Sequence, residues 1–319
     1  MALPTHLLRS SQPISQLQAL APAKPPGRPS AAAHARRAAW PLLVAGLALA
    51  VALLGCEDKV KAGGQRAGAL IDHLMPLVER DVKQVRDGLP EGAKKIAPLL
   101  EDQPGGDLAS LQRAIQKSRA SVQSLAIAKS TFFVFVDMQG TVLRSEVDPD
   151  LAAGGSLFKD IPEMKKLEDP KGGLVETFGK MHGLRGVQTG PDMQWVVGVP
   201  VSNAAGKALG SFVTGWSLRA YANFLEEDAR RFLEKSQGDQ IKAAPLVYVF
   251  LVRGKEAFGA PVTPDVDADA VGKLDIVTKA AAGTFQTTVD IEGRTFVLVA
   301  KPCAPLGSDV ALAILFSAA

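Results

Sequence analysis

Few side chains in this 319-residue chain are of types that do chemistry, and they are not grouped at catalytic spacings. Beyond residue 55 the histidines are His73 and His182, and neither has a second ligand at metal-binding spacing. A serine hydrolase would use one of them as its base, yet the sequence has no G-x-S-x-G nucleophile turn. Glycine pairs such as Gly172-Gly173 are too sparse for a phosphate-binding loop. We therefore expect no enzyme, no catalytic residue and no cofactor.

An acidic alternation, Asp265-Val266-Asp267-Ala268-Asp269, has the spacing with which calcium loops begin. It lacks the glycine and the distal glutamate that such a loop needs at fixed offsets. The pattern favours capping of a helix by these aspartates, and we predict no metal site.

The two cysteines are far apart and differ in their surroundings. Cys303 follows Pro302 beside an apolar run, which favours a buried, inert thiol over a reactive one. Cys56 ends an uncharged segment, 38–55, that directly follows a pair of arginines, Arg36-Arg37. This order of basic, apolar and small residues is typical of a secretory signal. The alternative is an uncleaved membrane-spanning helix, for which the segment is just long enough.

The tetrapeptide Leu53-Leu54-Gly55-Cys56 resembles the lipobox of bacterial lipoproteins. Leu53 and Gly55 match that pattern, whereas Leu54 stands where alanine or serine is commoner. The resemblance implies that residues 1–55 are removed and that the Cys56 thiol takes up diacylglycerol, with palmitate as a typical acyl chain. It implies a lipid-anchored protein of the cell envelope, on the extracytoplasmic side of the inner or outer membrane. The arginine pair is compatible with twin-arginine export.

Charge is divided unevenly between this leader and the rest of the chain. Residues 1–55 hold five of the 36 basic residues and none of the 33 acidic ones. The remainder therefore has 31 basic and 33 acidic residues, a net charge of −2. No block of lysine and arginine occurs in it, so we expect no nucleic-acid partner.

Helices are predicted for the first third of the mature chain. Apolar residues over 70–85 recur at three- and four-residue steps, which indicates an amphipathic helix. Pro76 is expected to kink or break it, and Gly88-Leu89-Pro90 to end it. The other elements predicted here are a polar tether over 57–65, a short helix reaching Leu100, and a helix capped by Asp107 that continues toward Ala128.

Strands are predicted from Thr131 onward. The run 132–136 is continuously apolar, aromatic and β-branched, and the turn Asp137-Met138-Gln139-Gly140 leads to a partner strand at 141–144. Further expected elements are helical pieces around 161–167, a hairpin of 194–199 with 208–216, and a helix over 218–235. A similar plan recurs in a strand at 246–252, a helix over 267–282, a hairpin of 284–289 with 294–299, and a strand at 310–316.

This order of elements, with Asp137-x-x-Gly140-x-Val142 after the first strand and a hairpin turned by Gly206-Lys207, resembles a Cache domain, the extracytoplasmic relative of PAS domains. The resemblance covers roughly residues 66–317 and is similar to a double-Cache sensor region. The expected fold class is α+β: an N-terminal helical stalk followed by two PAS-like antiparallel-sheet modules. The expected divisions are a signal peptide with lipobox over 1–55, a tether and stalk over 56–128, a first module over 129–236 and a second over 245–319.

The family implies a five-stranded antiparallel sheet whose concave face holds a small ligand under the middle loops. The residues that could line such a site are Arg144, Phe158, Phe178, His182, Arg185, Trp195 and Trp216. Arg185, between Gly183 and Gly186 in the sequence Gly183-Leu184-Arg185-Gly186, could clamp a carboxylate, but a solvated loop is the alternative for it and for His182. The tryptophans could instead be sheet core, Arg144 could pair with Glu146 at the surface, and the two phenylalanines could form an apolar lid.

We did not find the Tyr/Arg/Trp/Asp set with which amino-acid-binding double-Cache modules hold their ligands. Only three residues follow Phe316, so we expect no output domain in the chain. The predicted function is a membrane-anchored lipoprotein with a Cache-like sensor region. Its expected partners are membrane lipid through Cys56, a small-molecule ligand, and a membrane signalling or envelope protein. The alternative is an envelope interaction or scaffolding lipoprotein without a ligand.

Overall fold

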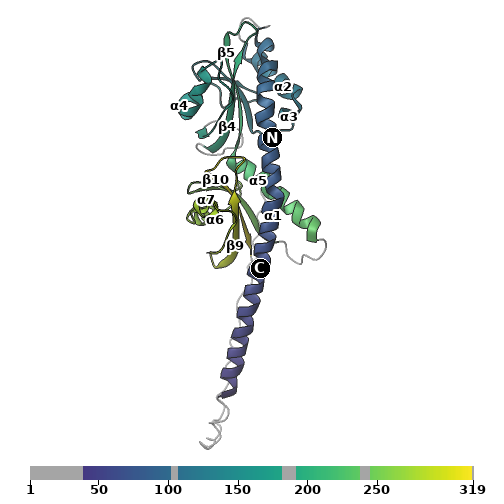
Figure 1. Ribbon diagram of the computed structural model, residues 1–319, viewed down its shortest axis with the longest axis vertical. Helices are drawn as coiled ribbons and strands as arrows, with labels where there is room; N and C mark the ends of the chain where they lie inside the picture. The colour runs from purple at the N-terminus through teal and green to yellow at the C-terminus, as the bar shows by residue number, and fades with distance from the viewer. Residues whose placement is uncertain (1–38, 102–106, 182–191, 238–244, 318–319) are drawn as a thin grey trace, which may run out of the picture. The chain divides into compact units, whose positions relative to one another are not determined.

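A computed structural model describes residues 39–101, 107–181, 192–237 and 245–317, with side chains described from residue 59 on (Figure 1). The chain divides into two compact units, Met1–Leu53 and Leu54–Ala319. The second unit contains both sheets and every helix except the first part of the N-terminal helix. Among the described residues, no helix carries an apolar run long enough to cross a membrane.

The first element is one uninterrupted helix, α1 (Ala39–Glu101), that contains Pro76, Pro90 and Pro98. The predicted break at Pro76 and the end predicted at Gly88-Leu89-Pro90 were therefore wrong, and the expected tether over 57–65 is helical. Burial supplies the reason, because the apolar stripe of this helix has almost no exposed surface. Burying each large apolar side chain contributes about 1.5–3 kcal/mol, which over the stripe outweighs about 3 kcal/mol for each interior proline. The fully buried apolar residues are Ala67, Leu70, Ile71, Leu74, Val78, Val85, Leu89 and Ile96.

Two short helices return from the end of α1. Asp107 caps α2 (Leu108–Ser121), as predicted, by accepting a hydrogen bond from the backbone N–H of Ala109 at 3.2 Å. The helix predicted to continue toward Ala128 is interrupted at Val122, which is extended, and resumes as α3 (Gln123–Ala126).

The rest of the chain forms two five-stranded antiparallel sheets with the same strand order. The first has the order β2-β1-β5-β4-β3 and the second β7-β6-β10-β9-β8. The first comprises β1 (Phe132–Val136), β2 (Val142–Ser145), β3 (Val175–Met181), β4 (Asp192–Ser202) and β5 (Ala208–Ser217). The second comprises β6 (Val247–Arg253), β7 (Glu256–Phe258), β8 (Phe285–Ile291), β9 (Arg294–Pro302) and β10 (Val310–Ser317). The predicted α+β class, its hairpins and the recurrence of one plan are confirmed; β3 and β7 were not predicted.

Helices cover both faces of each sheet (Figure 1). On one side α1 packs along both, near Gly63 against Val297 of β9 and near Gly92 against Phe212 of β5. On the other side α4 (Leu157–Asp160) and the 3₁₀ helix η2 (Pro162–Glu168) cover the first sheet, and α6 (Asp265–Gly272) and α7 (Ile276–Ala280) cover the second. The helix predicted over 267–282 is thus two helices, because Asp275 takes a left-handed conformation between them.

A last helix, α5 (Leu218–Gln237), follows β5 directly and leads to the second sheet. Its Tyr221 hydroxyl donates to the fully buried Asp81 of α1 at 3.1 Å. The loop after β9 places Cys303 in the core, where burial raises the pKa of its thiol to about 12. The prediction that this thiol is buried is confirmed.

Candidate functional site

The two tryptophans predicted as pocket candidates form part of the core under α1. Trp195 of β4 and Trp216 of β5 are directly paired across the strands, with ring centroids 4.2 Å apart, and both are fully buried. Tyr221 stacks on Trp216 at 4.6 Å. Because side chains alternate along a strand, these rings face away from the side that α4 and η2 cover. Both tryptophans therefore lie where the alternative interpretation, sheet core, placed them.

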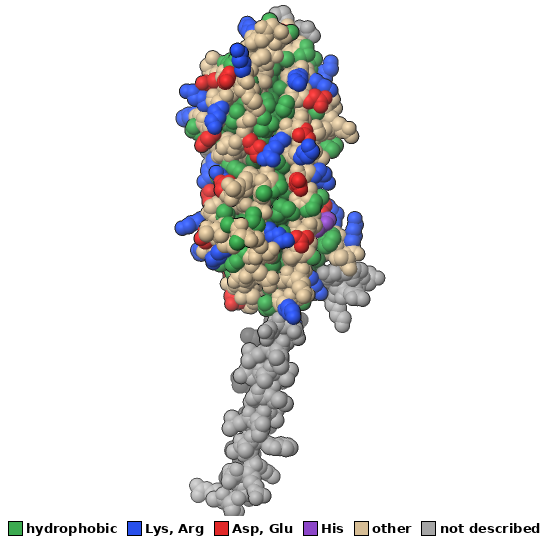
Figure 2. Space-filling view, viewed as in Figure 1, with side chains coloured by type: hydrophobic (Ala, Val, Ile, Leu, Met, Phe, Trp, Pro, Cys, Tyr) green, Lys and Arg blue, Asp and Glu red, His purple; other side chains and the backbone are tan. Residues whose placement is uncertain are grey.

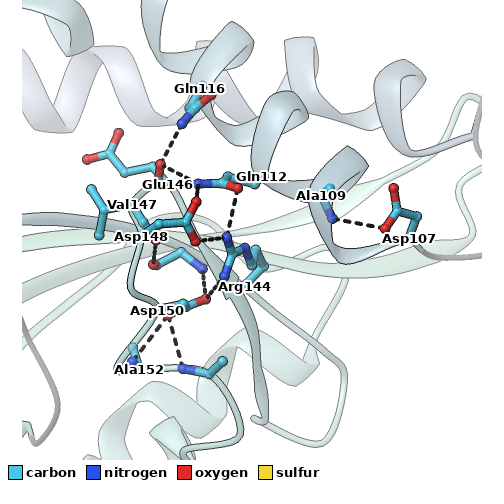
Figure 3. A network of polar contacts seen from close by, with 12 residues as sticks. Asp107, Ala109, Gln112, Gln116, Arg144, Glu146, Val147, Asp148, Asp150 and Ala152 are labelled. Atoms are coloured by element: carbon cyan, nitrogen blue, oxygen red, sulfur yellow. Dashed lines mark hydrogen bonds and ion pairs between the residues drawn. The ribbon is translucent and has the colours of Figure 1, made fainter.

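Arg144 is engaged in a polar network that shapes the chain after β2 (Figure 3). Its guanidinium donates to Asp148, to Asp150 at 3.3 Å and to the Gln112 side-chain carbonyl of α2 at 2.7 Å. The hydrogen bond with Asp148 is the main reason why the pKa of Arg144 is raised. The Asp150 carboxylate also accepts from the backbone N–H of Ser145 at 2.7 Å. The guanidinium therefore holds two segments together, and its buried Nε has no hydrogen-bond partner among the described residues.

An apolar layer lies between the first sheet and the pair α4 and η2, on the face where the resemblance implied a ligand. We call this the α4–η2 layer. An added Cβ at Gly198 of β4 would lie 2.7 Å from Leu167 and 2.8 Å from Met164, so the layer is closely packed at mid-strand. It consists of Phe132, Val134, Val136, Val142, Ala152, Leu157, Ile161, Met164, Leu167, Met181, Val196 and Val213.

The remaining candidates do not converge. Phe158 packs against the edge of the α4–η2 layer and lies directly over Gly140, which has a positive φ of 84° and no room for a Cβ. Phe178 of β3 packs instead with the core under α1, and the Arg253 guanidinium lies 4.7 Å from its ring centroid. His182 and Arg185 lie outside the described residues.

One end of the α4–η2 layer is polar. Gln194 shares a sheet face with Val196 of the layer, is fully buried, and lies opposite Ser217 in the β4–β5 register. Its side-chain N–H donates to Asp192 at 3.2 Å, and the Ser217 hydroxyl donates to the same carboxylate oxygen. The backbone N–H of Ser217 donates to the Thr131 hydroxyl at 3.2 Å. We call Thr131, Asp192, Gln194 and Ser217 the polar end.

The polar end presents hydrogen-bond acceptors. Within the described part of the chain, the side-chain carbonyl oxygen of Gln194 has no hydrogen-bond partner although it is buried. An amide carbonyl beside the Asp192 carboxylate suits an ammonium group or an amide N–H. Sequence reasoning missed this site, although Asp192-x-Gln194 places two polar side chains on one face of a strand that continues in apolar residues. The available signal was this pair of polar side chains, two residues apart, at the start of an otherwise apolar strand.

The polar end is connected to the helices on the other side of the sheet. Ser217 accepts a hydrogen bond from the backbone N–H of Ala220 at 3.1 Å, in the first turn of α5. Farther along α5, Asp228 lies 2.7 Å from the ring nitrogen of His73 on α1, and His73 stacks on Phe232 at 4.2 Å. The polar end and the α5–α1 contact are therefore joined by one helix.

Comparisons with known proteins find solved structures whose backbone folds are similar to this one. No family model and no curated protein matches the sequence. A sensory box/GGDEF family domain from Vibrio parahaemolyticus is 11% identical, with 81% of this chain and 97% of that chain covered and a TM-score of 0.47. The ligand-binding domain of the Campylobacter jejuni chemoreceptor Tlp3 in complex with L-valine is 12% identical, with coverages of 83% and 96% and a TM-score of 0.46.

A third similar structure is an extracellular ligand binding receptor from Desulfohalobium retbaense. It is 10% identical with a TM-score of 0.46, over 79% of this chain. The matched part spans only 40% of the length of that receptor. Identities of 10–12% assign neither a family nor a ligand to the present chain.

Proposed function

We propose that this chain is a lipid-anchored extracytoplasmic sensor protein whose first sheet binds a small molecule at the polar end. The observation that carries the proposal is the buried carbonyl of Gln194, which has no partner among the described residues and lies beside Asp192. A buried acceptor without a partner costs about 1–3 kcal/mol, so such a group calls for a bound ligand or water. The ligand we propose carries an ammonium group or an amide N–H.

The anchor in this proposal is the thiol of Cys56, acylated after removal of residues 1–55. Residue 56 belongs to the backbone of α1, the helix that packs against both sheets. At 1.5 Å per residue, the contact of α1 with the second sheet at Gly63 is about 10 Å along the helix from residue 56, and the contact with the first sheet at Gly92 about 54 Å. An anchor at Cys56 is thus joined to the ligand-binding sheet through a single continuous helix.

In this proposal, a membrane signalling or envelope protein beside this chain detects that ligand has bound. Ser217 belongs to the polar end and also accepts from the first turn of α5, so ligand binding changes the start of that helix. The helix in turn contacts α1 through Tyr221–Asp81 and Asp228–His73. A shift of α5 against α1 is the motion that a partner would detect.

One observation favours the alternative, an envelope scaffolding protein without a ligand. The α4–η2 layer is filled at mid-strand, where Gly198 has no space for even a methyl group. If the polar end holds only water, the first sheet is a packed interaction module.

Thermal unfolding separates these two functions. The full-length chain, purified in detergent, is heated with each of a panel of amino acids, amines, polyamines and organic acids. A ligand present at a hundred times its Kd stabilises by about 2.7 kcal/mol and raises the Tm by about 5 °C or more. We expect at least one ammonium compound to do this, and Gln194→Leu to abolish the shift while the exposed control Gln123→Leu retains it. A panel without any shift contradicts the sensor proposal.

A further inference from the structure

One carboxyl group beside the second sheet is buried without a partner. Asp267 of α6 is 4% exposed, and among the described residues its side chain forms no hydrogen bond and no ion pair. It is the middle member of Asp265-Val266-Asp267-Ala268-Asp269, and the outer two aspartates are exposed. The predicted capping by these aspartates was wrong, because Pro264 is the N-cap residue and no side chain caps α6. Asp267 therefore needs another explanation.

The side chain of Asp267 is directed toward the apolar layer between α6 and the second sheet (Figure 1). Residues four apart lie on one face of a helix, and Val271, four residues later, is fully buried in this layer. Tyr248 of β6 and Phe296 of β9 belong to the same layer, with ring centroids 6.3 Å apart. A carboxylate without a counter-charge is unfavourable in such a place, whereas the neutral acid is tolerated. Burial is accordingly the main reason why the pKa of Asp267 is raised.

Two exposed charges act on Asp267 in opposite directions. The carboxylate of Glu292, in the β8–β9 turn, adds to the rise in the pKa of Asp267, and the guanidinium of Arg294 opposes it. Burial, and then the charge of Asp267, raise the pKa of the Tyr248 hydroxyl. The other charged groups on the elements around α6 have contacts of their own: Glu256 of β7 with Lys180, Asp290 of β8 with Thr295, Lys279 of α7 with the Phe285 ring, Glu226 with Arg230 on α5, and Lys255 beside Gly272 at the far end of α6.

We propose that α6 is a pH-sensitive cover of the second sheet, seated when Asp267 takes up a proton from solvent and loosened when it releases that proton. The helix has eight residues and no side-chain cap, and it lies beside the three-residue edge strand β7. Such a short element at the edge of a sheet opens at a lower free energy than the central strands do. The charge on Asp267 is therefore felt first by α6.

The sign of the response follows from the burial. A carboxyl with a raised pKa in the folded state holds its proton between the unfolded pKa of about 3.9 and the folded-state pKa. Within that range the folded state binds more protons than the unfolded state, so stability falls as the pH rises. Above the folded-state pKa the penalty is complete, and α6 is at its loosest.

Hydrogen exchange of the α6 amides in the full-length chain, expressed as protection factors between pH 7 and pH 4, tests the proposal. We expect wild-type protection over 265–272 to rise as the pH falls. Asp267→Asn keeps the shape of the side chain and cannot ionise. It should protect α6 at least fivefold better than the wild type at pH 7 and remove the pH dependence. Asp265→Asn and Asp269→Asn, exposed on the same helix, are the matched controls and should follow the wild-type profile.

Two variants outside α6 give a second readout that does not depend on a substitution in the helix. Arg294→Gln removes a positive charge that favours the carboxylate, so the midpoint of the pH profile should move to higher pH, and Glu292→Gln should move it to lower pH. Equal profiles for the wild type and Asp267→Asn would overturn the proposal. So would a midpoint that neither exposed variant moves in the stated direction, or an Asp265→Asn profile like that of Asp267→Asn. None of these residues belongs to the polar end, so the outcome is independent of the first-sheet proposal.

Discussion

Single side chains at the contact between α1 and α5 give the fold a pH-dependent component. The carboxyl of Asp228 is partly buried, which by itself raises its pKa, but hydrogen bonds with His73 and Arg231 outweigh this and leave the pKa below its usual value. A carboxyl with a lowered pKa in the folded state stabilises the fold above its unfolded pKa of about 3.9. That stabilisation is lost as the pH falls through the folded-state pKa.

The first prediction concerns Asp228→Asn. We expect the variant to lower the free energy of unfolding at pH 6 and to make it fall less steeply below about pH 4 than in the wild type. Urea unfolding at a series of pH values measures both. The exposed Asp160→Asn is the matched control. Parallel pH profiles for wild type and Asp228→Asn would show that the contact with His73 does not make the free energy of unfolding depend on pH.

Residue-scale prediction from sequence failed where tertiary contacts decide the role of a side chain. Nothing next to Arg144 in sequence indicated that Gln112, 32 positions earlier, would hold its guanidinium. Trp195 and Trp216 were recognisable as paired strand residues, but which face of the sheet α1 would cover is not encoded in their alternation. Gln194 was missed because it stands with Asp192 at the start of β4, where a polar residue resembles an ordinary exposed strand end.

At the scale of elements, the continuity of α1 is decided by what it buries. Each proline inside it lacks an N–H and crowds the preceding turn. The helix persists because its apolar stripe packs against both sheets, and its glycines permit close approach, as at Gly92 beside Phe212 and Leu125.

Pro76→Ala tests that explanation. The substitution restores a backbone hydrogen bond and removes the clash without touching the buried stripe, since Leu74 and Val78 remain in place. We expect the free energy of unfolding to rise by about 1–3 kcal/mol. Pro261→Ala, in an exposed turn, should change it by less than about 0.5 kcal/mol. A loss of stability in Pro76→Ala would mean that the proline fits a bend that the helix needs.

Packing of the α4–η2 layer is tested by a second pair of variants. Gly198→Ala places a methyl group 2.7 Å from Leu167 and should cost about 1–3 kcal/mol of unfolding free energy by overpacking. Gly173→Ala has open space at its Cβ and serves as the control. Denaturant unfolding measures both. Equal stabilities for the two variants would indicate a loose layer with room for a ligand at mid-strand.

Element prediction from sequence succeeded for segments buried on both faces and for the edge strands β2 and β8, and it failed for the edge strands β3 and β7. β1, β6 and β10 are continuous apolar and β-branched runs, so their pattern alone identified them. β3 is an edge strand with one neighbour, is largely half-exposed, and contains Gly179 and charged residues, so no period was visible. The prediction for α1 was wrong because the destabilisation of a helix by proline can be read from the sequence. The burial of the apolar stripe, which compensates for it, cannot.

At the scale of the whole molecule, both sheets and α1 meet at one charged residue. Arg86 of α1 forms a two-pronged ion pair with Glu176 of β3, at 2.6 and 2.8 Å, and donates to the backbone oxygen of Pro305 after β9 at 2.8 Å. Glu176 also accepts from the Trp195 indole at 2.8 Å. Elsewhere lysines, arginines and acidic residues are interspersed over the face shown in Figure 2.

Cys56→Ser tests the proposed anchor. We expect the wild-type chain to sediment with membranes and to begin at an acylated Cys56 by mass spectrometry, because the thiol is the acceptor of the lipid. The serine variant should keep residues 1–55 and carry no lipid. Cys303→Ser removes the other, buried thiol and should mature normally. Normal maturation and retention of Cys56→Ser would exclude the lipoprotein proposal and leave the first-sheet site untouched.

The most direct test of the central claim is the affinity of the polar end for an ammonium ligand found in the thermal panel. Calorimetric titration compares the wild type with Gln194→Leu, Asp192→Asn and the control Gln123→Leu. The proposal predicts that the two polar-end variants each lose at least tenfold in affinity, since a charged hydrogen bond is removed, while the control binds as the wild type does. Wild-type affinity in both Gln194→Leu and Asp192→Asn would contradict it.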